Sequence, residues 1–177
     1  MKKRPTHRYS GAFGIPTPRC TFPLSPLLLV LFAGCQVEIP EAETDVLPQP
    51  EFEEIATAAA PEAIGPYSQA IRTDHALYLS GQIGLDPETG EMVEGGIEAE
   101  THQVMENLGA VLEAAGMDFG HVVQAQVFLA DLDDFSVMNE IYAGYLEAPH
   151  PARATIEAAR LPRDARVEIV MTAVERP

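Results

Sequence analysis

The sequence predicts an α+β domain in which two helices cover one face of a mixed sheet. Two observations support this fold class. Apolar residues recur at helical spacing between residues 97 and 115, and the run at 121–130 has the composition of a mostly buried strand. Taken in order, the expected elements are two strands, a helix, a strand, a helix and two strands. The other face of such a sheet stays uncovered in a single copy, which predicts an oligomer.

The first two strands are expected at 67–73 and 76–80. The pair Asp74-His75 between them suits a turn. The segment 86–90 is expected to be a loop, because it contains a proline that fixes φ and a glycine that tolerates positive φ.

The helices follow from apolar spacing and from residues that favour helix ends. The first is expected from Ile97 to Ala115, with Gly116 as its stop. The second should begin after Asp131, because Asp residues are good caps at a helix start. Its apolar positions are Phe135, Met138, Ile141, Tyr142 and Tyr145. The last two strands are expected at 154–159 and 165–174, separated by the segment 161–164.

Residues 1–34 have the features of a secretory signal of the lipoprotein type. They contain five basic residues and no acid, and their apolar centre at 27–33 is too short to span a bilayer of ~30 Å. Residues 31–35 resemble a bacterial lipobox, in which Cys35 would be lipidated and become the new N-terminus. Gln36 follows instead of an Asp that would retain the protein in the inner membrane, so we expect an outer-membrane anchor facing the periplasm. The alternatives are an organelle transit peptide or a misassigned start codon, which would leave the protein in the cytoplasm.

Residues 35–54 are expected to form an acidic tether, and residues 55–177 the folded domain. The tether segment combines several Glu and Asp residues with three prolines and few large apolar side chains. Such a segment buries too little apolar surface to offset the entropy of ordering. We therefore expect it to form an extended connection between the lipid on Cys35 and the domain.

Charge and residue content exclude several classes of function. The formal net charge is −16, and after residue 34 only six basic residues face 27 acidic ones, which argues against a nucleic-acid partner. Two cysteines cannot make a disulfide framework. No metal site is expected, because the histidines lack partners at ligand spacing and each reads as a surface or turn residue. These histidines include His75, His102, His121 and His150.

Two charged residues remain as candidates for chemistry. Arg153 is expected where a loop enters a strand, and an arginine there can grip a carboxylate with two parallel hydrogen bonds. A surface Arg paired with one of the many acids is an equally good interpretation. Glu168 lies within an apolar strand, so it faces either solvent or a cleft.

Several motifs in order along residues 57–175 resemble the reactive-intermediate deaminase family, also called the RidA or YjgF family and described as endoribonuclease L-PSP-like. The motifs lie at 63–70, 78–82, 86–90, 107–116, 127–135, 151–155, 159–162 and 167–169. Residues 1–50 have no counterpart in this family. The resemblance implies a chorismate-mutase-like subunit that forms a homotrimer, with clefts between subunits that bind small carboxylate-bearing imines or enamines.

The resemblance also implies an activity and roles for individual residues. Better-studied members hydrolyse 2-imino acids to 2-keto acids and ammonia without a cofactor. Arg153 would hold the substrate carboxylate, and Glu168 would orient or activate the attacking water with help from the backbone around Thr155. Further residues implied to line or adjoin the cleft are Tyr67, Ser80, Gly81 and Asn139.

Other functions compete with this interpretation. A binding or chaperone-like module could use the same cleft without turnover, although the presence of both Arg153 and Glu168 favours the enzyme. A ribonuclease role, also attached to the family, conflicts with a domain that has six Arg and no Lys. The segment 147–150 is shorter than in typical members, which would reshape the mouth of the cleft.

Overall fold

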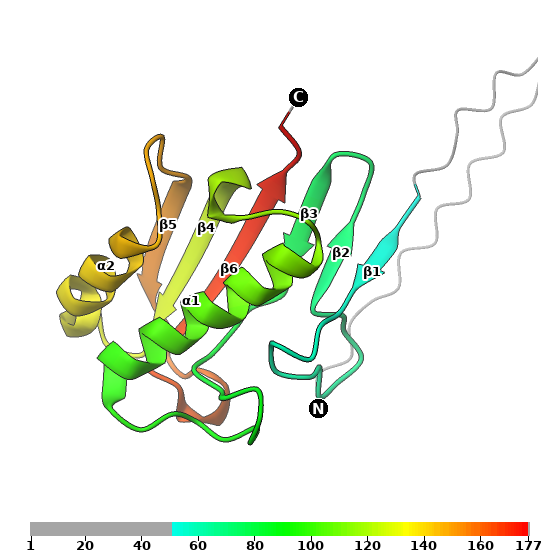
Figure 1. Ribbon diagram of the computed structural model, residues 1–177. Helices are drawn as coiled ribbons and strands as arrows, with labels where there is room; N and C mark the ends of the chain where they lie inside the picture. The colour runs from blue at the N-terminus through cyan, green and yellow to red at the C-terminus, as the bar shows by residue number, and fades with distance from the viewer. Residues whose placement is uncertain (1–50, 177) are drawn as a thin grey trace, which may run out of the picture. The chain divides into compact units, whose positions relative to one another are not determined.

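The computed structural model describes residues 51–176. These residues form a six-stranded sheet with the order β1-β2-β3-β6-β4-β5 (Figure 1). Neighbouring strands are antiparallel, except that β4 and β5 are parallel. The strands are β1 (Glu53–Ile55), β2 (Ala70–Arg72), β3 (Ala76–Leu79), β4 (Val122–Leu129), β5 (Ala152–Glu157) and β6 (Val167–Val174).

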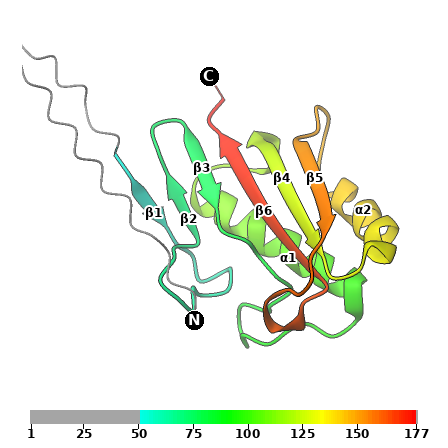
Figure 2. The same ribbon diagram turned by 180° about the vertical axis from the view of Figure 1, so that it is seen from behind.

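Two α-helices, α1 (Gly96–Ala114) and α2 (Phe135–Gly144), lie on the same face of this sheet. They stand in front of the strands in Figure 1 and behind them in the reversed view of Figure 2. Gly116, with φ 71°, adopts the left-handed conformation that ends a helix, as the sequence predicted for α1. The expected mixed sheet with two helices on one face is therefore confirmed.

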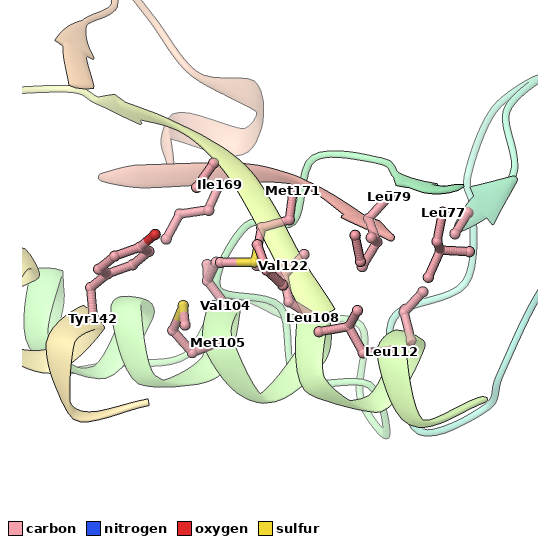
Figure 3. Packing of buried hydrophobic residues seen from close by; sticks show 14 of the residues in the cluster. Leu77, Leu79, Val104, Met105, Leu108, Leu112, Val122, Tyr142, Ile169 and Met171 are labelled. Carbon is pink, nitrogen blue, oxygen red and sulfur yellow. The ribbon is translucent and has the colours of Figure 1, made fainter. Parts of the chain in front are cut away.

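The core lies between the helices and the face of the sheet that they cover, which we call the helix face (Figure 3). Helix α1 contributes one apolar stripe, and β4 and β6 contribute every second residue, as their period of two requires. All of these side chains are at most 1% exposed: Val104, Met105, Leu108, Val111, Leu112, Ala125, Val127, Leu129, Val167, Ile169, Met171 and Ala173.

The opposite face of the sheet, which we call the open face, is covered by no other element of residues 51–176 (Figure 2). It carries apolar side chains that remain accessible: Tyr78 on β3 is 54% exposed and Ile156 on β5 is 52% exposed. A folded domain that leaves such side chains on a continuous face has a surface suited to another protein surface.

Strand β1 crosses the expected boundary between tether and domain. Glu53, in the acidic segment, pairs with Arg72 of β2 in the sheet register, and their side chains form an ion pair at 3.5 Å. The predicted signal and Cys35 lie outside the described residues. Within residues 51–176, neither helix is both long and apolar enough to cross a membrane.

Candidate active site: two half-sites on opposite faces of the sheet

Arg153 is the second residue of β5, at the entrance of the strand as expected, although the strand begins at Ala152, two residues earlier than expected. In the parallel ladder Arg153 is opposite Ala125, whose side chain is fully buried on the helix face. Directly paired residues share a face, so Arg153 also points to the side of the helices. There its Nη2 donates a hydrogen bond of 2.7 Å to Oδ1 of Asn139 on α2.

Two aromatic rings of α2 also contact the Arg153 guanidinium. Its central carbon lies 4.7 Å from the ring centroid of Tyr142 and 5.7 Å from that of Phe135. Together with Asn139 these residues follow the spacing of one helix face. Cations over aromatic faces within about 6 Å are attracted by the ring quadrupole. The guanidinium is thus oriented by three side chains from one helix, while it retains N–H donors for another acceptor.

The charge of Arg153 has no carboxylate partner among the residues that the structure describes. Four other arginines of this region are in ion pairs: Arg72, Arg160, Arg163 and Arg166. Arg153 lines a cavity of about 390 Å³ with Asn139, Tyr142 and residues of the 143–151 segment, and no acid is part of its lining. In such an acidic protein this cavity is a favourable place for an anion. We call it the Arg153 half-site.

Tyr142 forms the floor of this half-site and is only 5% exposed. Burial raises the pKa of its hydroxyl, and the charge of Arg153 and a polar contact with its guanidinium oppose that shift. This contact falls short of a well-formed hydrogen bond, and the hydroxyl has no other partner within residues 51–176. The contribution of Tyr142 to this half-site therefore comes from its ring more than from its hydroxyl.

Glu168 lies on β6 in register with Phe128, so it points to the open face. Its side chain is half-buried, and this burial raises the pKa of the carboxyl group. The carboxylate lies directly over Gly81: a Cβ built on Gly81 would overlap Oε1 and lie 3.0 Å from Cδ. Only glycine at position 81 leaves room for Glu168 in this orientation. The absence of a side chain, and not backbone freedom, is the reason for this glycine.

A cavity of about 370 Å³ surrounds the Glu168 carboxylate. Its walls come from residues of segments 61–67 and 80–85, together with Pro162 and Arg163. Tyr67, Ser80 and Gly81, three residues implied by the sequence resemblance, are all among them. We call this cavity the Glu168 half-site.

Hydrogen bonds explain why the chain before β2 forms a wall of this half-site and not the longer strand expected from residue 67. Tyr67 N–H closes a tight turn onto the Gly65 carbonyl at 2.8 Å. Ser80 Oγ donates to the Ser68 carbonyl at 2.7 Å, so this hydroxyl ties the segment to the end of β3. The buried Gln69 amide donates to the carbonyls of Ala60 and Pro61, at 3.1 and 2.8 Å.

The two half-sites are separate within one subunit. Arg153 and Glu168 are two strands apart and three residues apart along β4, which corresponds to about 10 Å in each direction. Their side chains also leave the sheet on opposite faces. One copy of the chain therefore cannot bring both residues to the same small molecule.

Thr155 lies on β5 on the same face as Arg153, in register with Val127. It lines neither half-site. Its Oγ1 is buried and has no hydrogen-bond partner among the described residues.

Sequence reasoning did not assign a role to every residue in these cavities. Phe135 and Tyr142 were interpreted only as the apolar face of α2, although their spacing from Asn139 was a usable signal. His150 was interpreted as a surface or turn histidine, and it is exposed, but it also lines the Arg153 half-site. Arg163 contributes to the Glu168 half-site from the connecting segment expected at 161–164, but no role was assigned to it.

The family of this chain follows from its similarity to known proteins. A family model described as endoribonuclease L-PSP matches residues 57–175. The chain belongs to this family. It is similar to a mouse protein named 2-iminobutanoate/2-iminopropanoate deaminase, with 52% identity over 123 residues, which are 70% of this chain and 91% of the mouse protein.

Solved structures of relatives share the fold with this member of the endoribonuclease L-PSP family. The crystal structure of RidA from an Antarctic Psychrobacter bacterium has a TM-score of 0.67 at 45% identity, covering 70% of this chain and 99% of the other. E. coli TdcF with bound serine has a TM-score of 0.68 at 36% identity, with coverages of 70% and 99%. These comparisons confirm the sequence resemblance and the YjgF-like fold.

Proposed function

We propose that this protein hydrolyses reactive 2-imino acids, or the enamines from which they form, to 2-keto acids and ammonia. The proposal rests mainly on the environment of Arg153. This arginine has no carboxylate partner in the described residues, side chains of α2 orient it, and it lines a cavity without acids. The name of the mouse relative gives the reaction, at 52% identity. The relative with bound serine shows that a protein of this fold accepts a small molecule with a carboxylate.

In the proposed reaction, Arg153 binds the substrate carboxylate through two parallel N–H···O bonds. A water oxygen then forms a bond to the carbon of the protonated imine, and Glu168 accepts a proton from that water to leave a carbinolamine. The protonated Glu168 returns this proton to the amine nitrogen. The C–N bond then breaks, ammonia leaves, and the hydroxyl group gives its proton back to Glu168 as the keto group forms. Burial raises the pKa of Glu168, which makes its carboxylate a better proton acceptor than an exposed one. The backbone around Thr155 would hold the water.

We further propose that the site is completed between subunits of a homotrimer. The Arg153 half-site of one subunit would meet the Glu168 half-site of its neighbour, with Tyr67, Ser80 and Gly81 on the Glu168 side and Asn139 on the other. Two observations support this assembly: Arg153 and Glu168 point to opposite faces of one sheet, and the open face carries exposed apolar side chains. Each interface is then heterologous, and a ring of three closes it.

The proposal includes no nucleic-acid substrate, although the family description names an endoribonuclease. Residues 51–176 contain six arginines and no lysine against a large excess of acids, and four of those arginines are in ion pairs. Binding to a phosphate backbone requires clustered, available cations.

The proposed cellular location rests on the sequence of the N-terminus alone. We propose that Cys35 is lipidated and anchors the protein to the outer membrane, facing the periplasm, through the acidic segment. Mass spectrometry of the N-terminal peptide tests this, with Cys35→Ser as the control. An unmodified, uncleaved chain in the soluble fraction would instead support a misassigned start site.

The activity is tested by generating 2-iminobutanoate with an amino-acid oxidase and measuring keto-acid release with and without the purified protein. We expect acceleration by the wild type and its loss in Arg153→Ala, with the oligomer retained, because this side chain lies outside the apolar core. If a well-folded protein gives no acceleration, the deaminase proposal fails for these substrates. Retained binding of small carboxylates in that case would support the alternative, a binding or chaperone-like module that uses the Arg153 half-site alone.

A further inference from the structure

His150 and Arg153 are the two residues with basic side chains in the lining of the Arg153 half-site. His150 lies three residues before Arg153, on the segment that leads into β5. Its side chain is exposed and makes no hydrogen bond or ion pair with any other described residue. Its nitrogen atoms therefore remain available to a ligand in the cavity.

The chain holds His150 in place from both sides. Pro149 and Pro151 are its immediate neighbours, and each proline fixes its own φ angle. A residue before proline is itself restricted to extended conformations. Presentation of His150 at the rim of the cavity therefore costs little conformational entropy when a ligand binds.

The charges around His150 favour an anion. The other ionisable residues in the cavity lining are Arg153 from β5 and Tyr142 from α2, and the remaining lining residues are apolar or amide side chains. Glu147 lies on the same segment but does not line the cavity. A protonated imidazole at this position would place a second cation in the same cavity as Arg153.

We propose that His150 is a specificity-determining residue that favours imino acids carrying a second carboxylate in their side chain. This inference rests on the proposed deaminase function. Arg153 binds the carboxylate next to the imine carbon, and protonated His150 binds the carboxylate at the far end of the substrate. The Glu168 half-site is less suited to that second carboxylate, because Glu62 and Glu168 both line it and its one arginine, Arg163, is already paired with Glu91.

The same cavity lining also predicts how the preference depends on pH. Arg153 keeps its charge throughout the working range, whereas an imidazole loses its charge as the pH rises. The advantage of a dicarboxylic substrate over a monocarboxylic one should therefore shrink with rising pH. An ion pair with a partly exposed partner changes affinity by about twofold to fivefold.

The test compares two probes on the full-length protein. L-Glutamate oxidase generates 2-iminoglutarate, and an L-amino-acid oxidase generates 2-iminobutanoate. Keto-acid release above the enzyme-free rate gives kcat/KM for each probe at pH 6 and pH 8. The measured quantity is the ratio of the two kcat/KM values, in which the intrinsic pH dependence of imine hydrolysis largely cancels.

The expected ratio is about twofold to fivefold higher at pH 6 than at pH 8 in the wild type. His150→Phe should abolish this difference, and His150→Lys should keep the high ratio at both pH values. His75→Phe, an exposed histidine in the turn between β2 and β3, is the matched control and should behave as the wild type. A ratio that does not depend on pH, or that His150→Phe leaves in place, overturns the inference even when 2-iminobutanoate is hydrolysed. If neither probe is hydrolysed, the proposed function itself fails.

Discussion

The contact between Tyr142 and Arg153 gives a prediction that separates the ring from the hydroxyl. Tyr142→Leu removes the ring that lies 4.7 Å from the Arg153 guanidinium, while Tyr142→Phe keeps the ring and removes only the hydroxyl. We expect Leu at this position to weaken substrate binding, because the guanidinium loses one of its orienting contacts. We expect Phe to preserve binding.

The magnitudes follow from the structure. A cation over an aromatic face contributes about 0.5–2 kcal/mol, depending on how far water is excluded. If that contact orients Arg153, its loss should raise KM by about twofold to thirtyfold, with a smaller change in kcat. Removal of a buried hydroxyl without a partner removes a group whose desolvation costs about 1–3 kcal/mol. Tyr142→Phe should therefore be at least as stable as the wild type.

Steady-state kinetics with 2-iminobutanoate and urea unfolding measure both effects. The reasoning is refuted if Tyr142→Phe loses binding as strongly as Tyr142→Leu, because the hydroxyl and not the ring would then position Arg153. A Tyr142→Leu protein with wild-type KM would show that Asn139 and Phe135 suffice.

Two further predictions concern the Glu168 half-site. Gly81→Ala should lower kcat, because the added methyl group displaces the Glu168 carboxylate; Gly144→Ala, whose Cβ would have no atom within 4 Å, is the control and should retain full activity. Equal effects of the two substitutions would contradict the close contact at Gly81. Burial raises the pKa of Glu168 above 4.5, so its ionised form costs stability at pH values above the raised pKa, and this cost disappears as the pH falls below 4.5. Glu168→Gln should thus raise Tm relative to the wild type at pH 7 and have no such effect at pH 4, and a Tm difference independent of pH would refute the assignment.

The sequence predicted α1 and β6 well, because the pattern of apolar residues in each is compatible with only one type of secondary structure. The apolar residues of α1 recur on a single face, and β6 alternates fully buried residues with half-buried ones. Strand β1 could not be predicted, since it contains Glu53 and Glu54, whose charges are typical of unpaired chain. It forms because its backbone pairs with β2, which no local pattern shows.

The site could be predicted only as a set of residues, not as an arrangement. The sequence of β5 has little apolar alternation, so neither its start nor the face that receives Arg153 follows from composition. The parallel pairing of β5 with β4 determines that face. The separation of Arg153 from Glu168 is thus a result of tertiary structure. Because of it, the site residues implied by the family resemblance lie in two separate half-sites.

The measurement that tests the account most directly is complementation between two inactive variants. Arg153→Ala and Glu168→Gln are purified separately, mixed in equal amounts, dissociated and reassembled. A site built between neighbouring subunits of a ring is intact when Arg153 comes from one variant and Glu168 from the other, so random mixing restores about a quarter of wild-type activity. Each variant reassembled alone should remain inactive. Mixed oligomers, verified by native mass spectrometry, that show no recovery would contradict a site shared between subunits.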